Sequence, residues 1–147
     1  MSEVTLRDVT RENWVECARL KVAEAQSAFV APNVWSLAES KYDPTWIPQA
    51  VYAGEEMVGF VMYGVEDGAG WILRFMVDER HQGKGYGRAA IRAAIPRLRA
   101  LAGGGPIRLS VVPSNTGAME FYRKAGFVET GEMSHGEAVM DLLPDAG

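Results

Sequence analysis

The sequence of 147 residues contains one cysteine, no long apolar run and no excess of positive charge. Because Cys17 has no partner for an intramolecular disulfide, the expected compartment is the cytoplasm. Every apolar run meets a charge or a glycine before about eighteen residues, so neither a membrane-spanning helix nor a membrane partner is expected. The first residues, Met1-Ser2-Glu3-Val4, have no basic flank before an apolar stretch and predict no signal peptide.

Acidic residues outnumber basic ones, 19 to 15, which gives a formal net charge of −4. Nucleic-acid-binding proteins usually carry a basic excess, so no nucleic-acid partner is expected. Four arginines cluster at positions 88, 92, 97 and 99, either as a solvated helix face or as an anion site. An acidic surface mildly favours a cationic small molecule as substrate. No group of cysteine and histidine residues has the spacing of metal ligands, so no metal is predicted.

The length and the hydrophobic content of 48% predict one domain that spans residues 1–147. Apolar alternation predicts strands at residues 4–8, 50–53, 57–65, 71–77 and 107–112, and a final pair around residues 134–136. Helical spacing predicts helices after Thr10, at 34–41, at about 85–102 and at 115–124. This order predicts an α/β fold in which helices flank a mixed, mostly antiparallel central sheet, with a strand–helix–strand unit near its middle.

Two helices have apolar stripes that should face the core. In the first helix the stripe consists of Trp14, Cys17, Ala18 and Val22. In the long helix it consists of Ala90, Ile91, Ala94, Ile95, Leu98 and Leu101.

A glycine-rich segment, residues 80–88, lies between a predicted strand and a predicted helix and reads Arg-His-Gln-Gly-Lys-Gly-Tyr-Gly-Arg. Backbone N–H groups without side chains in the way can approach a phosphate there, and the helix dipole favours negative charge. The glycines alternate, which matches neither the dinucleotide fingerprint nor the P-loop. On this segment alone, a structural turn without a ligand stays an alternative.

Three linked segments resemble the GNAT superfamily of N-acetyltransferases. Arg80-x-x-Gly83-x-Gly85 matches its pyrophosphate signature, [QR]-x-x-G-x-[GA]. Residues 74–79 resemble the splayed strand that precedes this signature, and residues 115–127, which read Asn-x-x-Ala-x-x-Phe-Tyr-x-x-x-Gly-Phe, resemble the helix and turn that follow it. The resemblance is firm from Ala50 onward and loose before it.

The resemblance implies a GNAT fold whose splayed strand pair holds acetyl-coenzyme A, which would donate an acetyl group to a primary amine of a small molecule. The main chain of Phe75, Met76 and Val77 would bind the pantetheine arm. The pyrophosphate would lie against the loop formed by Gly83, Lys84, Gly85, Tyr86, Gly87 and Arg88. Asn115 and Ala118 would line the wall near the thiol.

Tyr122 is the candidate catalytic residue that the resemblance implies, as the donor of a proton to the departing thiolate. Its alternative role is packing beside Phe121 and Phe127. His81, expected to face solvent in the loop, and His135, in a predicted turn, are not proposed as bases. The sequence does not identify a general base.

The acceptor is less defined. Residues 58–64 and 78–85 are similar to bacterial diamine and polyamine acetyltransferases, but Leu73 stands where those enzymes often carry an acid. The fold implied places an acceptor wall on the segment that contains Gln26, Phe29, Asn33, Trp35 and Glu39. Glu132 and Glu137 flank the final hairpin and are further candidates for the same mouth. For each of these acids, Glu39 included, an ordinary surface charge is the alternative. An aminoglycoside, an amino acid or a protein N-terminus stays an alternative acceptor. A non-catalytic coenzyme A-binding module stays an alternative function. The chain could also form a homodimer.

Overall fold

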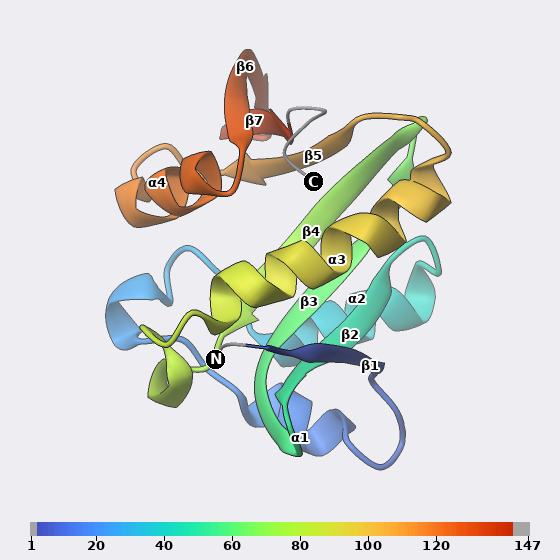
Figure 1. Ribbon diagram of the computed structural model, residues 1–147, viewed down its shortest axis with the longest axis vertical. Coiled ribbons are helices and arrows are strands. Elements are labelled where there is room, and N and C mark those ends of the chain that lie inside the picture. The colour runs from blue at the N-terminus through green and yellow to red at the C-terminus, as the bar shows by residue number, and fades with distance from the viewer. Residues whose placement is uncertain (1–2, 143–147) are drawn as a thin grey trace.

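The computed structural model describes residues 3–142 and contains one seven-stranded sheet (Figure 1). Its strands are β1 (Thr5–Asp8), β2 (Ile47–Ala53), β3 (Glu56–Glu66), β4 (Ala69–Val77), β5 (Ile107–Val111), β6 (Phe127–Ser134) and β7 (Glu137–Leu142). Their order across the sheet is β1-β2-β3-β4-β5-β7-β6, and all neighbours are antiparallel except β4 and β5. The predicted mixed, mostly antiparallel α/β sheet is therefore confirmed.

Helices cover both faces of this sheet. They are α1 (Trp14–Arg19), α2 (Asn33–Tyr42), α3 (Tyr86–Ala102) and α4 (Thr116–Lys124), with 3-10 turns at η1 (Glu24–Gln26) and η2 (Glu79–His81). Figure 1 shows α3 crossing one face of the sheet while α1 and α2 lie behind the strands. Within residues 3–142 no helix is long and apolar enough to cross a membrane.

Each face has its own hydrophobic core. The α3 stripe of Ile91, Ala94, Ile95 and Leu98 is buried in one cluster with strand residues such as Val61. Each fully buried aliphatic side chain of this kind contributes about 1.5–3 kcal/mol. Cys17 and Leu20 pack with residues of β2, β3 and β4 in a second cluster. Leu101 is the exception in the expected α3 stripe, because it lies in the last turn of the helix and is 51% exposed.

Helix α1 is shorter than expected, and only part of its predicted stripe faces the core. Cys17 is fully buried, but Trp14 is 46% exposed at the first helical position. The helix ends at Arg19 because Leu20 is extended and the next N–H, that of Lys21, donates to the Asp78 side chain. Val22 consequently lies beyond the helix. The end of α1 is therefore set by Asp78, a residue far away in the sequence that the local spacing of apolar residues does not reveal.

The sheet opens between β4 and β5. These parallel strands pair only at Gly70 with Ile107 and at Trp71 with Arg108, at the start of both strands. Two residues further along β4, the β3–β4 register shifts at Leu73, and a bulge of this kind bends a strand and increases its twist. Helix α3 makes the crossover between the two strands. The predicted splayed strand pair is thus present, with its open end toward the α3 N-terminus.

Candidate active site

The glycine loop ends at the N-terminus of α3. Gly83 and Gly85 have φ values of 79° and 85°, a left-handed conformation that glycine adopts without a steric penalty. Gly85 is the N-cap, so the next N–H groups belong to the first turn of α3 and have no intrahelical acceptor. A Cβ on Gly83 would meet nothing within 4 Å. The loop therefore presents open backbone donors, together with the positive end of a 17-residue helix, to an anion.

A cavity of about 540 Å³, here called the glycine-loop cavity, extends from this loop along β4 to α4. Ten of the eleven residues predicted to bind the cofactor line it: Phe75, Met76, Val77, Gly83, Gly85, Tyr86, Gly87, Arg88, Asn115 and Ala118. Lys84 is exposed and lies outside this lining. The structure thus brings segments from β4, the loop, α3 and α4 into one concave surface.

The charge of the glycine-loop cavity suits a polyanion. Arg88 and Lys124 line it, and none of its described lining residues is an aspartate or glutamate. Lys124 was not among the predicted cofactor residues, because only the fold brings the end of α4 near Arg88. Gly87 lies against the aromatic side of the cavity, where a Cβ on it would be 3.4 Å from the Phe121 ring. The residues present therefore fit the diphosphate and pantetheine of coenzyme A.

The main chain of β4 supplies hydrogen-bonding groups to this cavity. The N–H of Asp78 donates to Val58 of β3 at 2.8 Å, and strand residues alternate in direction. The backbone groups of Met76 therefore face β3, whereas those of Phe75 and Val77 face the gap beside β5. One of the latter, the Val77 carbonyl, accepts a hydrogen bond of 2.9 Å from the Gln82 side chain.

A second cavity, of about 290 Å³, lies on the other side of the opening and is called the hairpin cavity because Glu137 of the β6–β7 hairpin lines it. It shares five lining residues with the glycine-loop cavity: Val30, Phe75, Asn115, Ala118 and Tyr122. The two cavities therefore meet where β4 and β5 diverge. A ligand in one can therefore reach a ligand in the other at this junction.

Tyr122 lies at the junction, on α4. Its ring is half-buried and packs edge-on against Phe121 and Phe127, with centroid separations of 5.2 and 5.9 Å. Within residues 3–142 the hydroxyl has no hydrogen-bond partner. Burial raises the pKa of the phenol above its ordinary value, so the hydroxyl stays protonated at neutral pH. Packing and proton donation are compatible here, because the ring is held by aromatics while the hydroxyl is unengaged.

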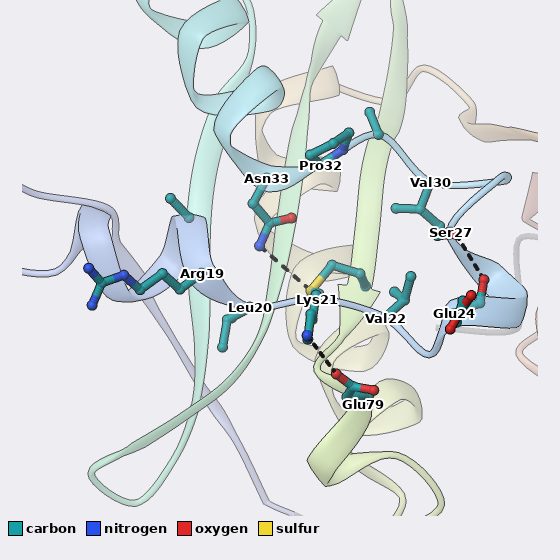
Figure 2. A pocket seen from close by; sticks show the side chains of 13 residues that line it. Arg19, Leu20, Lys21, Val22, Glu24, Ser27, Val30, Pro32, Asn33 and Glu79 are labelled. Atoms are coloured by element: carbon teal, nitrogen blue, oxygen red, sulfur yellow. Dashed lines mark hydrogen bonds and ion pairs between the residues drawn. The ribbon is translucent and has the colours of Figure 1, made fainter.

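A third cavity, of about 530 Å³, lies between α1, η1 and α2 (Figure 2). Asn33, predicted to contact the acceptor, is buried against it and donates to the Cys17 carbonyl at 2.9 Å. Figure 2 shows the same amide directed at a sulfur, which is that of Met76 at 3.7 Å. Asn33 therefore connects α2 to α1 and β4.

The other predicted acceptor residues do not form one wall. Gln26 lines the glycine-loop cavity and accepts a hydrogen bond of 2.9 Å from Gln82, whereas Phe29 lines the hairpin cavity. Trp35 is 66% exposed on the outer side of α2, because Asn33 and Ser36 take the inner side. Glu39 forms an ion pair of 3.2 Å with Arg74.

His81 is buried, although it was expected to face solvent. It is 8% exposed and lines the glycine-loop cavity. Asp78 caps the η2 turn that precedes the loop, and this turn directs the imidazole inward, 3.4 Å from Glu56 and edge-on to the Tyr86 ring. The expectation was wrong because it treated the whole segment as an open loop.

An opened sheet with an anion-binding helix N-terminus at one end of the opening is the geometry of acyltransferases that use a coenzyme A thioester. The chain belongs to the acetyltransferase (GNAT) family, whose model matches residues 8–127. It is therefore an N-acetyltransferase that uses acetyl-coenzyme A, and the resemblance on which the fold and activity were predicted is confirmed.

The relatives agree with this assignment, and a solved structure agrees with the fold. The chain is 32% identical to spermine/spermidine N(1)-acetyltransferase of Bacillus subtilis (strain 168), with 93% of this chain and 96% of the relative covered. It is 30% identical, over the same shares, to a probable spermine N(1)-acetyltransferase of Bacillus subtilis subsp. natto (strain BEST195). The fold resembles that of spermidine N-acetyltransferase from Vibrio cholerae in complex with CoA and spermine, with a TM-score of 0.73, 21% identity and coverage of 96% of this chain and 94% of that one.

Proposed function

We propose that this enzyme transfers the acetyl group of acetyl-coenzyme A to a primary amine of a small diamine or polyamine. The observation that carries the proposal is the junction of two cavities at Tyr122, one suited to a polyanion and the other containing an acid. The relatives that are 32% and 30% identical are named as acting on spermine or spermidine, which supports the same class of acceptor.

The glycine-loop cavity is the proposed site of acetyl-coenzyme A. Backbone N–H groups of residues 83–88 would bind the pyrophosphate, and the side chains of Lys84, Arg88 and Lys124 would add positive charge. The gap-facing backbone of Phe75 and Val77 would pair with the pantetheine amides. When bound, acetyl-coenzyme A supplies an activated acyl carbon at the junction.

The protein groups at the junction have complementary tasks. An N–H of β4 that faces the gap would stabilise negative charge on the thioester oxygen as the amine nitrogen attacks. Tyr122 would donate its proton to the sulfur as the carbon–sulfur bond breaks. The attacking nitrogen must be neutral, so an ammonium acceptor loses a proton before or during the attack.

A panel of acceptors tests the proposal through thiol release from acetyl-coenzyme A. Spermidine and short diamines are expected to give rates far above the hydrolysis background. If they give none while an aminoglycoside, an amino acid or a peptide N-terminus reacts, the acceptor class is wrong and that alternative replaces it.

Two sequence-based expectations stay predictions. They are a cytoplasmic location and a homodimeric state. A solved neighbour, spermidine N-acetyltransferase from Vibrio cholerae, is described as dodecameric, which supports self-association without fixing the number of subunits. Sedimentation of the purified chain would measure that number.

A further inference from the structure

The sheet face opposite α3 carries a row of polar side chains near the opening. On β5, Leu109 and Val111 pack into the α3-side core, so the alternation of a strand directs Ser110 to the opposite face. On β7, Met140 belongs to the same core, and alternation directs Glu137 to the face of Ser110. The hydroxyl of Ser110 donates to Glu137 Oε1 at 2.9 Å. Glu137 is therefore held across β5 and β7 in a fixed position at the hairpin cavity.

Glu137 differs in its partner from the other acids nearby. Asp141, four positions further along β7, forms an ion pair of 3.0 Å with Arg108. Glu39 of α2 forms an ion pair of 3.2 Å with Arg74. Among residues 3–142, Glu137 has the Ser110 hydroxyl as its hydrogen-bond partner and no cation within ion-pair distance. Its charge is therefore available to a cation that enters the cavity.

Arg74 is the cation that could cancel this charge. It lines the hairpin cavity together with Glu137, on the bulged part of β4. Its guanidinium is directed to Glu39 instead, and both partners of this ion pair are partly shielded from water. Without the Glu39 carboxylate, the nearest unpaired acid in the cavity available to Arg74 would be Glu137.

We infer that Glu137 binds the ammonium group of the acceptor that does not react, and that Glu39 is a positioning residue that keeps Arg74 away from it. The inference rests on the proposed function and deepens it. The attacking nitrogen at the junction must be neutral, whereas a carboxylate stabilises a charged nitrogen. A diamine satisfies both requirements, with one amine at the thioester and the other at Glu137. Glu137 thereby supplies the acid that is missing at Leu73.

The first test compares 1,5-diaminopentane with pentylamine, which has the same chain and lacks the second amine. In Glu137→Gln the KM for the diamine should rise about 10- to 100-fold, as expected for the loss of one hydrogen bond to a charged group. The kcat for the diamine and the kcat/KM for pentylamine should change less than about threefold. Glu132→Gln, on the same hairpin but outside the cavity, is the matched control and should leave all constants unchanged.

The second test removes the partner of Arg74. Glu39→Gln should raise the KM for the diamine with little change in kcat. Adding Arg74→Met to the same chain should restore the wild-type KM. A merely structural role of Glu39 would not give this rescue. Melting curves and the Kd for acetyl-coenzyme A confirm that the variants fold.

Unchanged diamine KM in Glu137→Gln, or an equal loss for diamine and pentylamine, overturns the role of Glu137. An unchanged KM in Glu39→Gln, or a loss that Arg74→Met does not rescue, overturns the role of Glu39. If the wild-type enzyme acetylates no diamine, the proposed acceptor class and this inference are both wrong. If the wild type acetylates diamines and only the variants behave differently from these expectations, the inference alone is wrong.

Discussion

The carboxylate of Asp78 accepts a hydrogen bond of 3.0 Å from the backbone N–H of Lys21, a residue 57 positions earlier in the chain. The same carboxylate caps η2 through the N–H of Arg80 and accepts a second bond from its guanidinium at 2.8 Å. One buried acid thus joins the end of β4, the start of the glycine loop and the chain that leaves α1. This connection lies next to two residues that line the glycine-loop cavity, Val22 after α1 and Val77 at the end of β4.

Replacing Asp78 by Asn should lower the free energy of unfolding by about 2–3 kcal/mol, since hydrogen bonds to a charged group are lost. Burial alone would raise the pKa of Asp78, but the bonds from the Lys21 N–H and from Arg80 outweigh it and lower the pKa. A carboxyl whose folded pKa is lowered stabilises the fold above its unfolded pKa, about 3.9, and this stabilisation is lost as the pH falls through the folded value.

Denaturant unfolding of the wild type and of Asp78→Asn from pH 7 to pH 2 measures both effects. The difference between them should be constant above about pH 5 and should shrink below about pH 4. Glu79→Gln is the control, because its ion pair with Lys21 is exposed and should contribute less than about 1 kcal/mol. A difference that does not change with pH would contradict the assignment to the Asp78 charge.

Two glycines at the ends of α3 provide a matched test of the cofactor site. Gly85 at the N-cap and Gly103 at the C-cap both have left-handed backbones, with φ values of 85° and 58°. Valine at either position should cost stability, at least about 1–2 kcal/mol, because a Cβ is strained in this conformation. Only Gly85→Val should also block the approach of the loop to the pyrophosphate, raising the Kd for acetyl-coenzyme A at least about tenfold.

Calorimetric titration of both variants with acetyl-coenzyme A, at a temperature where each is folded, separates strain from binding. Equal affinities in Gly85→Val and Gly103→Val would show that the loop does not hold the pyrophosphate.

Local pattern was enough to predict most elements. The hairpin of β2 and β3, the pair β6 and β7, and helices α3 and α4 follow from apolar periodicity and turn residues, which act over a few positions. The start of α4 was predicted at Asn115, and this residue is its N-cap, with the side chain accepting from the Ala118 N–H at 3.3 Å. The opening beside β5 was implied by the family resemblance, because no local pattern specifies it. The order of the strands across the sheet was not predicted, since it depends on pairing between segments far apart in the sequence.

The predictions that were wrong concern residues whose contacts are made by segments far away in the sequence. His81 is buried because η2 turns it toward Glu56 and Tyr86, and the length of α1 is limited by Asp78. The resemblance implied one acceptor wall of five residues, whereas the structure places them around different cavities and on the surface of α2. Their contact with the acceptor stays a prediction. Glu137 was one of several acids until the register of β5 and β7 placed it beside Ser110.

Cys17 should take no part in acetyl transfer. Burial against the second core raises the pKa of its thiol to about 12, so almost no thiolate is present at neutral pH. Cys17→Ala should keep kcat within about twofold, with a stability loss of about 1 kcal/mol from the smaller side chain. A disulfide reagent should label the thiol only after denaturation. Labelling of the folded enzyme in parallel with loss of activity would contradict this expectation.

Tyr122→Phe should lower kcat by about 10²- to 10⁴-fold, the usual contribution of a general acid. The substitution keeps the ring that packs against Phe121 and Phe127 and removes a hydroxyl that has no hydrogen-bond partner within residues 3–142. The melting temperature and the Kd for acetyl-coenzyme A should therefore change little. Because burial raises the pKa of the phenol above 10.0, its ionisation should not reduce the wild-type kcat below about pH 10.

Tyr63→Phe is the matched control for this prediction. Its hydroxyl donates to Gln49 Oε1 at 2.6 Å in the core, away from the junction. Removing it leaves Gln49 Oε1 with the hydrogen bond of 3.0 Å from Arg97, so the cost should be about 0.5–1.5 kcal/mol, and kcat should be unchanged. The two variants should thus have opposite phenotypes: Tyr63→Phe loses stability and keeps turnover, whereas Tyr122→Phe keeps stability and loses turnover. At saturating substrate concentrations, kcat includes both amine attack and loss of the thiolate. If Tyr122→Phe retains most of the wild-type kcat under these conditions, Tyr122 has a packing role alone.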